Sequence, residues 1–297
     1  DSNMTYCREA YVDGAAVNAH LANVGALFGQ FLTEAATLER VRLHGNASEL
    51  AVMRPDWDAL GLGDTLKYWR NVMGFSVMQE VFDTLPADAS GYLPYEFATI
   101  MPTFTINDWP KVQTYLNVFV ERTYYGESVP NASVLYYGWD VLEDENGTVT
   151  HLFCREAYKN GAGVVAHLNN VGGLLGEMLG TGAATLTELH FTGPFTDAEK
   201  AEVESILGGT QTFYDTSTAR TASNIMGFSQ QASEAAKVLD TMDFAIISPH
   251  FDVTDWVAGG PIMEDFVNAT KTEPGSQYCE CPANAAHQLM ADTHLSL

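Results

Sequence analysis

The sequence predicts an α+β protein in which a unit of two helices and four strands occurs twice. Residues 6–24 (YCREAYVDGAAVNAHLANV) match residues 153–171 (FCREAYKNGAGVVAHLNNV) at an offset of 147, and residues 96–109 match residues 243–256 at the same offset. Within the matches, alternating apolar residues indicate strands, and apolar residues three and four apart indicate helices. The expected fold class is therefore α+β, with two β-α-β-β-α-β units of about 147 residues.

The middle of the chain contains one whole unit. Its expected elements are, in order, a strand at 96–106, a helix from Asp108 to Val120, a strand at 133–142, a hairpin turn at 145–148, a strand at 149–158, a helix from Val164 to Leu175, and a strand at 186–191. Asp108 is a suitable N-cap, with Pro110 in the first turn. Asn146-Gly147 predicts a type I′ turn, because these two residues tolerate the positive φ angles that the turn requires. A helical segment is expected over about 196–240.

The repeat is permuted relative to the ends of the chain. Residues 4–45 supply a third strand, a second helix and a fourth strand, and 56–85 are expected to add helices. Residues 243–281 supply a first strand, a first helix and a second strand. The expected divisions are a half unit at 1–92, a complete unit at 93–242, and a complementary half unit with a tail at 243–297. The two half units either close on each other within one chain or are completed by neighbouring molecules.

The repeated segment resembles the antibiotic-biosynthesis-monooxygenase-like group of dimeric α+β barrels, whose unit is ferredoxin-like. The residues that carry the resemblance are Arg8, Glu9, Tyr11, Ala19, His20 and Leu21, and again Arg155, Glu156, Tyr158, Ala166, His167 and Leu168. The resemblance implies that the two sheets pair into one barrel. It implies no single activity, because the group includes cofactor-free oxygenases, haem degraders and proteins without assigned chemistry.

Charge and composition exclude some classes of function and favour one compartment. The chain has 14 basic and 38 acidic residues and a net charge of −24, which argues against nucleic acid as a partner. No apolar run reaches the roughly 20 residues that a membrane span requires. The start at Asp1 fits the removal of a leader, and four cysteines permit disulfides. A secreted glycoprotein is expected, with five sequons at Asn3, Asn46, Asn131, Asn146 and Asn268.

Four side chains are candidates for chemistry, and each has a structural alternative. His20 and His167 could act as a general base or a ligand in a barrel cleft, but their helical spacing favours buried, hydrogen-bonded histidines. Arg8 and Arg155 could hold an anionic substrate, although cross-strand pairing with a carboxylate is the simpler interpretation. Each arginine points to the opposite face of its strand from the glutamate that follows it. No metal-binding motif and no cofactor is expected.

The cysteines allow a prediction from strand register. With a two-residue turn at Asn146-Gly147, paired residue numbers sum to 293, so Cys154 faces Trp139. Cys7 occupies the equivalent place in the other unit, and its partner strand comes from the C-terminal half. A disulfide is therefore predicted between Cys7 and either Cys279 or Cys281. Cys154 pairs with the remaining cysteine or stays free.

The sequence favours a non-enzymatic function. We expect an extracellular structural glycoprotein that forms a head-to-tail polymer or filament, with half units completed by neighbouring copies. The expected partners are other copies of the chain and N-linked glycans, without membrane insertion. The alternative is a secreted, cofactor-free oxygenase-like enzyme or a small-ligand-binding protein that uses the barrel cleft.

Overall fold

The structure is a computed structural model, and it describes residues 4–76, 98–127, 133–208, 212–215, 227–229, 245–271, 273 and 275–280. The described helices are α1 (Gly14–Glu34), α2 (Ala47–Asp58), the short η1 (Gly63–Thr65), α4 (Trp109–Glu127), α5 (Gly161–Gly180), α6 (Asp197–Leu207) and α7 (Trp256–Lys271). The described strands are β1 (Met4–Tyr6), β2 (Arg8–Tyr11), β3 (Ala36–Gly45), β4 (Leu66–Ser76), β5 (Ala98–Ile106), β6 (Val134–Glu143), β7 (Val149–Tyr158), β8 (Ala184–Gly193), β9 (Thr212–Asp215), β10 (Gly227–Ser229), β11 (Ala245–Val253) and β12 (Ser276–Glu280).

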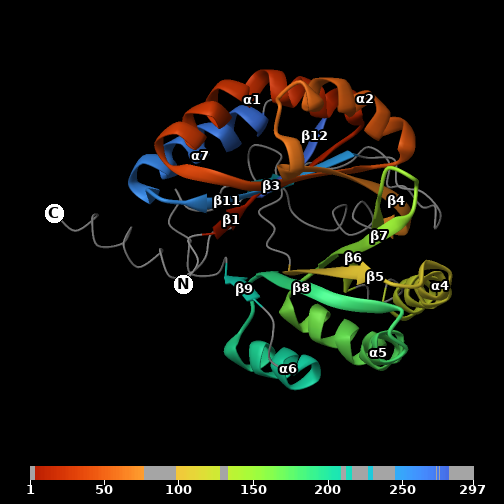
Figure 1. The fold of residues 1–297 in the computed structure, drawn as a ribbon. Coiled ribbons are helices and arrows are strands. Elements are labelled where there is room, and N and C mark those ends of the chain that lie inside the picture. The colour runs from red at the N-terminus through yellow and green to blue at the C-terminus, as the bar shows by residue number, and fades with distance from the viewer. Residues whose placement is uncertain are drawn as a thin grey trace.

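The chain is an α+β protein, as the sequence predicts. Figure 1 shows the strands between two groups of helices, with α1, α2 and α7 on one side and α4, α5 and α6 on the other. Apolar side chains from alternate strand positions pack under each group, for example Val41 and Leu43 of β3 beneath the first group. In the part of the chain that the structure describes, no helix is long and apolar enough to cross a membrane.

Local sequence explains where the main helices begin. Asp13 caps α1, where its Oδ1 accepts a hydrogen bond from the backbone N–H of Ala16 at 2.7 Å. Asn160 caps α5 in the same way through the N–H of Gly163. A side-chain oxygen at this position satisfies one of the amide donors that a helix leaves unpaired at its start. The two helices that carry His20 and His167 therefore begin at defined positions relative to the strands before them.

One sheet contains the strands that the structure describes, in the order β10-β12-β2-β11-β3-β4-β6-β7-β5-β8-β9, with β1 also paired to β11. The same pairing pattern occurs twice, because β11 lies antiparallel between β2 and β3 while β5 lies antiparallel between β7 and β8. β11 comes from the C-terminal half unit, and β2 and β3 come from the N-terminal one. The half units therefore pair with each other within one chain, and neighbouring molecules are not needed for this pairing.

The sheet curls until side chains of distant strands meet. Four strands separate β3 from β8 in the sheet order, yet Arg40 of β3 contacts Glu188 of β8 at 2.5 Å. His190 of β8 likewise lies 6.4 Å, between ring centroids, from His250 of β11. We call the face on which these side chains meet the inward face, and the face that packs against the helices the outward face.

Two segments that the sequence predicts as helical contain strands. Residues 66–76 form β4, which runs parallel to β3 and antiparallel to β6. Within the segment expected to be helical at 196–240, α6 is followed by the strands β9 and β10. The pattern of β4 misleads because both of its faces carry buried apolar residues: Leu66 packs outward and Trp69 packs inward. A strand buried on both faces lacks the alternation of apolar and polar residues that identifies strands in sequence.

The hairpin between β6 and β7 follows the predicted register but not the predicted turn. Trp139 pairs with Cys154 and Leu142 with His151, so these pairs sum to 293 as expected. Near the tip the register shifts by one, and Glu143 pairs with Val149. Only Gly147 has a positive φ, of 77°, so the type I′ prediction is wrong, because that turn requires two such residues. Asp144 closes the longer loop by accepting from the N–H groups of residues 146 and 148.

The contact between α1 and α7 yields a testable expectation at two adjacent glycines. A Cβ on Gly259 would lie 2.9 Å from Phe31 Cε2 and 3.1 Å from Ala35 Cβ, whereas a Cβ on Gly260 would meet nothing within 4 Å. We expect Gly259→Ala to lower the free energy of unfolding by about 1–3 kcal/mol through overpacking. Gly260→Ala should instead raise it by up to about 1 kcal/mol, since alanine favours the helix. Urea unfolding of both variants measures the signs, and equal signs would contradict the close approach.

Candidate functional site

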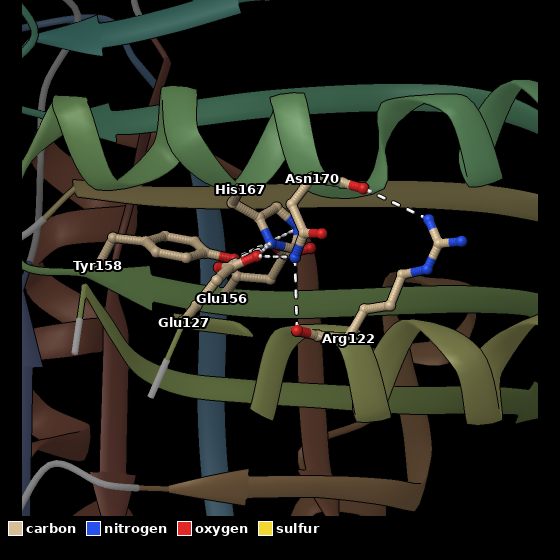
Figure 2. Close-up of polar contacts among 6 residues, drawn as sticks. All are labelled: Arg122, Glu127, Glu156, Tyr158, His167 and Asn170. Carbon is tan, nitrogen blue, oxygen red and sulfur yellow. Dashed lines mark hydrogen bonds and ion pairs between the residues drawn. The ribbon is translucent and has the colours of Figure 1, made fainter. Parts of the chain in front are cut away.

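His167 of α5 is buried between two glutamates on the outward face. Its Nδ1 lies 3.0 Å from Glu127 Oε1 at the end of α4, and its Nε2 lies 3.1 Å from Glu156 Oε2 on β7. The Tyr158 hydroxyl donates to the same Glu156 oxygen at 2.7 Å, and the Asn170 amide donates to Glu127 at 2.7 Å. Figure 2 shows these side chains converging on the imidazole from α4, α5 and β7. We call Glu127, His167 and Glu156 the second Glu–His–Glu cluster.

His20 of α1 lies in a matching set of contacts, the first Glu–His–Glu cluster. Its Nε2 is 2.9 Å from Glu9 Oε2 on β2, and its Nδ1 is 2.8 Å from Glu273 Oε2. The Tyr11 hydroxyl donates to Glu9 at 2.5 Å, and the Asn23 amide donates to Glu273 at 2.5 Å. Glu127, the last residue of α4, and Glu273, just after α7, were not identified from the sequence, because they lie at helix ends far along the chain from the histidines.

The carboxylates around each ring favour the charged form of both imidazoles. Burial alone would lower the pKa of His20, but Glu9 and Glu273 outweigh it and raise the pKa to about 9. Burial opposes the charge of His167 as well, yet Glu156 and Glu127 raise its pKa. Each ring nitrogen faces a carboxylate, so neither histidine presents a free nitrogen to a substrate. The geometry matches the structural interpretation of these histidines, and a catalytic role for them stays untested.

Arg155 and Glu156 point to opposite faces of β7, as alternation requires. Glu156 contacts His167 on the outward face, while Arg155 Nε donates to Asp140 Oδ2 of the neighbouring β6 at 3.0 Å on the inward face. This contact is the cross-strand ion pair with a carboxylate that the sequence predicts. Arg8 lies on β2 with its backbone paired to Glu280, but its side chain is outside the described residues.

Asp140 also orients a histidine that sequence reasoning missed. The Oδ2 atom of Asp140 lies 3.1 Å from Nδ1 of His44 on β3, and its Oδ1 atom accepts from the amide of Asn71 at 3.1 Å. Burial raises the pKa of Asp140, but Arg155 and His44 outweigh this effect and hold it at about 2. Burial and Arg155 lower the pKa of His44 to about 4 against the opposing pull of Asp140. His44 is therefore neutral at pH 7.

The tautomer of His44 follows from these partners. The Asp140 carboxylate can only accept, so Nδ1 of His44 carries the proton and donates to it. Nε2 is then a lone-pair acceptor. The His44 side chain is fully buried, and Nε2 has no hydrogen-bond partner among the residues that the structure describes. A buried polar atom without a partner costs about 1–3 kcal/mol, so such an atom requires an explanation.

Aromatic and cationic groups surround this histidine. Its ring stacks on Trp69 of β4 at 6.0 Å between centroids and lies tilted against Phe153 of β7 at 5.2 Å. The Arg42 guanidinium of β3 lies 4.6 Å from the Phe153 ring centroid and 5.3 Å from that of Trp69. The indole Nε1 of Trp69 is also buried without a partner in the described part of the chain. We call Arg42, His44, Trp69, Asp140, Phe153 and Arg155 the inward-face cluster.

Exposure falls steadily along β3 toward this cluster. The side chain of Arg40 is 27% exposed, that of Arg42 is 7% exposed, and that of His44 is fully buried. Glu188 of β8, which contacts both arginines, is 32% exposed. The arginines and a hydrogen bond from His190 lower the pKa of Glu188 against its burial, so it is a carboxylate. The inward face therefore meets solvent at the Arg40–Glu188 pair and is buried near His44.

Further unpartnered polar atoms lie on inward-facing positions of other strands. They are, within the described ranges, Nε of Arg40 and the hydroxyls of Thr99 and Thr103 on β5 and Thr192 on β8. Each threonine is adjacent to apolar residues of the outward core, for example Phe104 and Phe191, so alternation places it inward. Unpartnered polar atoms also occur in the outward cores, for example Nε1 of Trp57 and Nε1 of Trp139, but those on the inward face lie beside the arginines of β3.

The cysteine predictions have mixed outcomes. Cys7 is buried and disulfide-bonded, while Cys154 is a buried free thiol. Cys154 therefore does not belong to the predicted disulfide set, because it lies among the side chains under α4 and α5, where burial raises its thiol pKa. The side chain of Cys279 and all of Cys281 lie outside the described residues, so the choice between them stays open.

Of the predicted glycosylation sites, Asn146 and Asn268 are exposed, and Asn46 caps α2 through its side-chain oxygen. Asn3 and Asn131 lie outside the described residues. In the described part of the chain, no group of three or more His, Cys, Asp and Glu side chains could hold a metal ion.

The residues that the sequence did not single out share one property. His44, Asp140, Arg42 and Trp69 lie on strands whose inward side chains look like ordinary core or surface positions in isolation. The available signal was the polar residue at every second place of 40–44 (Arg40, Arg42, His44), with the apolar Val41 and Leu43 between them. Such alternation marks a polar face, but only the curl of the sheet shows that this face is enclosed.

Comparisons with known proteins return few matches. No protein-family model and no curated protein sequence matches the chain. Among solved structures, MupZ from Pseudomonas fluorescens is similar with 27% identity, a TM-score of 0.31, and coverage of 40% of this chain and 88% of MupZ. An inferred monooxygenase from Lactobacillus acidophilus NCFM is similar with 6% identity, a TM-score of 0.27, and coverage of 64% of this chain and 92% of that protein.

These findings correct the expected function. One of the two similar structures is named as a monooxygenase and neither is named as a filament subunit, and the expectation of a non-enzymatic structural glycoprotein in a head-to-tail polymer is wrong. The fold supplies the physical reason, since β11 completes the N-terminal half unit within the same chain. Both TM-scores are low, so any positive assignment of function has to come from the geometry of the inward face.

Proposed function

We propose that this protein binds a small organic molecule against the inward face of its curled sheet. The observation that carries the proposal is the set of buried polar atoms without partners on that face, above all His44 Nε2 and Trp69 Nε1. On the outward face, by contrast, every nitrogen of His20 and His167 has a carboxylate partner. Buried groups left unpaired in this way are typical of a site whose missing partner is a ligand or an ordered water.

The surroundings have the chemical character of a small-molecule site. The polar atoms lie beside the aromatic rings of Trp69 and Phe153, and small-molecule sites combine apolar walls with a few placed polar groups. The Arg40–Glu188 pair marks the end of the inward face that solvent reaches. A molecule entering there meets Arg42 before it reaches His44.

The binding proposal predicts stabilisation by small molecules. A compound present at about 100 times its Kd stabilises the folded state by about 2.7 kcal/mol, which raises the melting temperature by several degrees. We therefore expect hits in a thermal-shift screen of small organic compounds, and Arg42→Gln should abolish the shifts. Lys111→Gln, which removes an exposed charge on α4, is the matched control and should keep them.

Native mass spectrometry of the gently purified protein provides an independent measurement. Mass retained beyond that of the chain in the wild type, and missing in Arg42→Gln, supports the binding proposal. If the wild-type chain carries no small molecule and no compound shifts its melting temperature, the proposal is wrong.

Oxygenase-like catalysis on the bound molecule is the second candidate, and one observation favours it. Asp140 fixes the His44 tautomer so that Nε2 is a neutral acceptor, which is the form that a general base requires. Oxygen consumption measured with the compounds that bind tests this candidate. It requires activity in the wild type that His44→Ala removes while binding persists.

Secretion belongs to the proposal as well. The disulfide at Cys7 supports it, because structural disulfides persist in oxidising compartments. Non-reducing mass spectrometry of the protein from its natural source tests this point, and a reduced Cys7 thiol there would contradict it.

A further inference from the structure

The inward face has a charge that contrasts with the rest of the molecule. Its described ionised groups near His44 are three arginines (Arg40, Arg42 and Arg155) and two carboxylates (Asp140 and Glu188), which gives 3 − 2 = +1 in a chain of net charge −24. The neighbouring histidines do not reverse this balance. Burial and the arginines Arg40 and Arg42 hold His250 neutral by lowering its pKa. A local positive field in an acidic protein favours an anionic ligand.

The two unpartnered nitrogens of the inward-face cluster require opposite partners. Trp69 Nε1 carries a hydrogen and can only donate, so its missing partner is an acceptor. His44 Nε2 can only accept, because Asp140 holds the ring proton on Nδ1, so its missing partner is a donor. A simple carboxylate ion satisfies the indole but leaves the imidazole unpaired. A molecule that carries both an anionic group and a hydroxyl or amine hydrogen satisfies both.

The rings restrict the shape of the ligand. The His44 ring is inclined by 22° to that of Trp69, and Arg42 lies over both Trp69 and Phe153. Flat aromatic and guanidinium groups favour flat partners, which they contact over a whole face. The alternative occupant is a single ordered water, which also donates once and accepts once.

We propose that the ligand is a small planar organic acid with a hydrogen-bond donor, held by Arg42 and the Trp69 N–H through its anionic group and by His44 Nε2 through its donor. This inference rests on the proposed function and names the chemical class of its ligand. In this arrangement His44 determines specificity, since it discriminates between acids that differ only in a donor.

A panel of matched probes tests the inference. The probes are 3- and 4-hydroxybenzoate, benzoate, phenol, and the neutral 3-hydroxybenzamide, with affinities measured by calorimetry. We expect at least one hydroxybenzoate to bind about tenfold more tightly than benzoate, because one buried hydrogen bond of about 1.4 kcal/mol corresponds to that ratio. Phenol and the benzamide, which lack the negative charge, should bind at least about tenfold more weakly than the hydroxybenzoate.

Two variants assign the contacts to residues. In His44→Ala the preference for the hydroxyl should disappear, so that hydroxybenzoate and benzoate bind within about twofold of each other. Trp69→Phe removes the indole N–H together with one ring of the indole, and keeps an aromatic side chain at this position. It should weaken both acids by roughly fivefold and leave their ratio unchanged. Val257→Ser, at an exposed position of α7, should change neither value. If His44→Ala does not fold, Trp69→Phe alone still tests the anion contact.

The outcomes separate this inference from the binding proposal beneath it. If the benzamide binds as tightly as the acids, a small-molecule site exists but the anionic class is wrong. If His44→Ala still binds hydroxybenzoate more tightly than benzoate, His44 does not accept the hydrogen bond from the ligand hydroxyl. If no probe binds and the thermal-shift screen is also empty, the inward face holds water only, and both proposals fail.

Discussion

Replacing His167 with leucine is expected to lower the free energy of unfolding by about 3–5 kcal/mol. The substitution leaves Glu127 and Glu156 buried, at 7% and 5% exposure, without the cation between them. Removing one partner of a buried ion pair costs this much because an uncompensated charge stays in a medium of low polarity. Burial raises the pKa of Glu156 even with His167 in place, so its charge depends on the histidine. Urea unfolding at pH 7 measures the loss.

Two further variants separate lost charge from lost packing. Ala166→Ser, at the exposed neighbouring position of α5, should change stability by less than about 0.5 kcal/mol. Adding Glu156→Gln to His167→Leu should recover part of the loss, because the double variant removes one of the stranded charges. A His167→Leu variant that loses less than about 1 kcal/mol would show that the cluster does not depend on a charged histidine.

Local periodicity predicts the positions of His167, Arg155 and Glu156 but not their partners. The spacing of His167 on α5 predicts a buried histidine, and the alternation of Arg155 and Glu156 predicts that they face opposite sides of the sheet. Both predictions follow from local periodicity, and the structure shows both contacts. The partners of these residues could not be predicted, because Glu127 and Asp140 become neighbours only through the packing of α4 on α5 and the pairing of β6 with β7.

The inward-face cluster is even harder to predict from local sequence, because its residues become neighbours only in the folded sheet. Its residues come from four strands, and in the sequence they range from Arg42 to Arg155. Periodicity assigns each of them to a face of its own strand. It does not show that the sheet curls far enough for β3 to meet β8, since curl results from the twist accumulated over many strands. For this reason the sequence identified the histidines of the outward face, His20 and His167, and missed His44.

Stability is also expected to fall on both sides of about pH 6.5, with a different histidine responsible on each side. His20 has a pKa of about 9 in the folded state against an ordinary value of 6.5. Because the pKa is raised in the folded state, charged His20 stabilises the folded protein fully below about pH 6.5. This stabilisation is lost as the pH rises through about 9. The difference between the two pKa values corresponds to about 3 kcal/mol of stability, at about 1.36 kcal/mol for each pKa unit. The raised pKa of His167 acts in the same direction.

His44 produces the loss on the acid side. Its folded-state pKa of about 4 lies below the ordinary 6.5, so the unfolded chain takes up the proton first as the pH falls. The contribution of His44 is therefore present above about pH 6.5 and is lost toward pH 4. His250, whose pKa is also lowered, adds to this side.

Urea unfolding of the wild type, His20→Gln and His44→Gln between pH 4.5 and about 9 tests the assignment. Each variant is the control for the other. His20→Gln should flatten the alkaline limb and keep the acid limb, while His44→Gln should do the reverse. Buried tyrosines and the Cys154 thiol also lower the stability of the folded state at high pH, because they ionise more easily in the unfolded chain. In the unfolded chain they ionise only near pH 8.5–10, which is above most of the pH range in which His20 loses its proton. An alkaline limb that keeps its slope between about pH 6.5 and 8 in His20→Gln would show that Glu9 and Glu273 do not hold a charged imidazole.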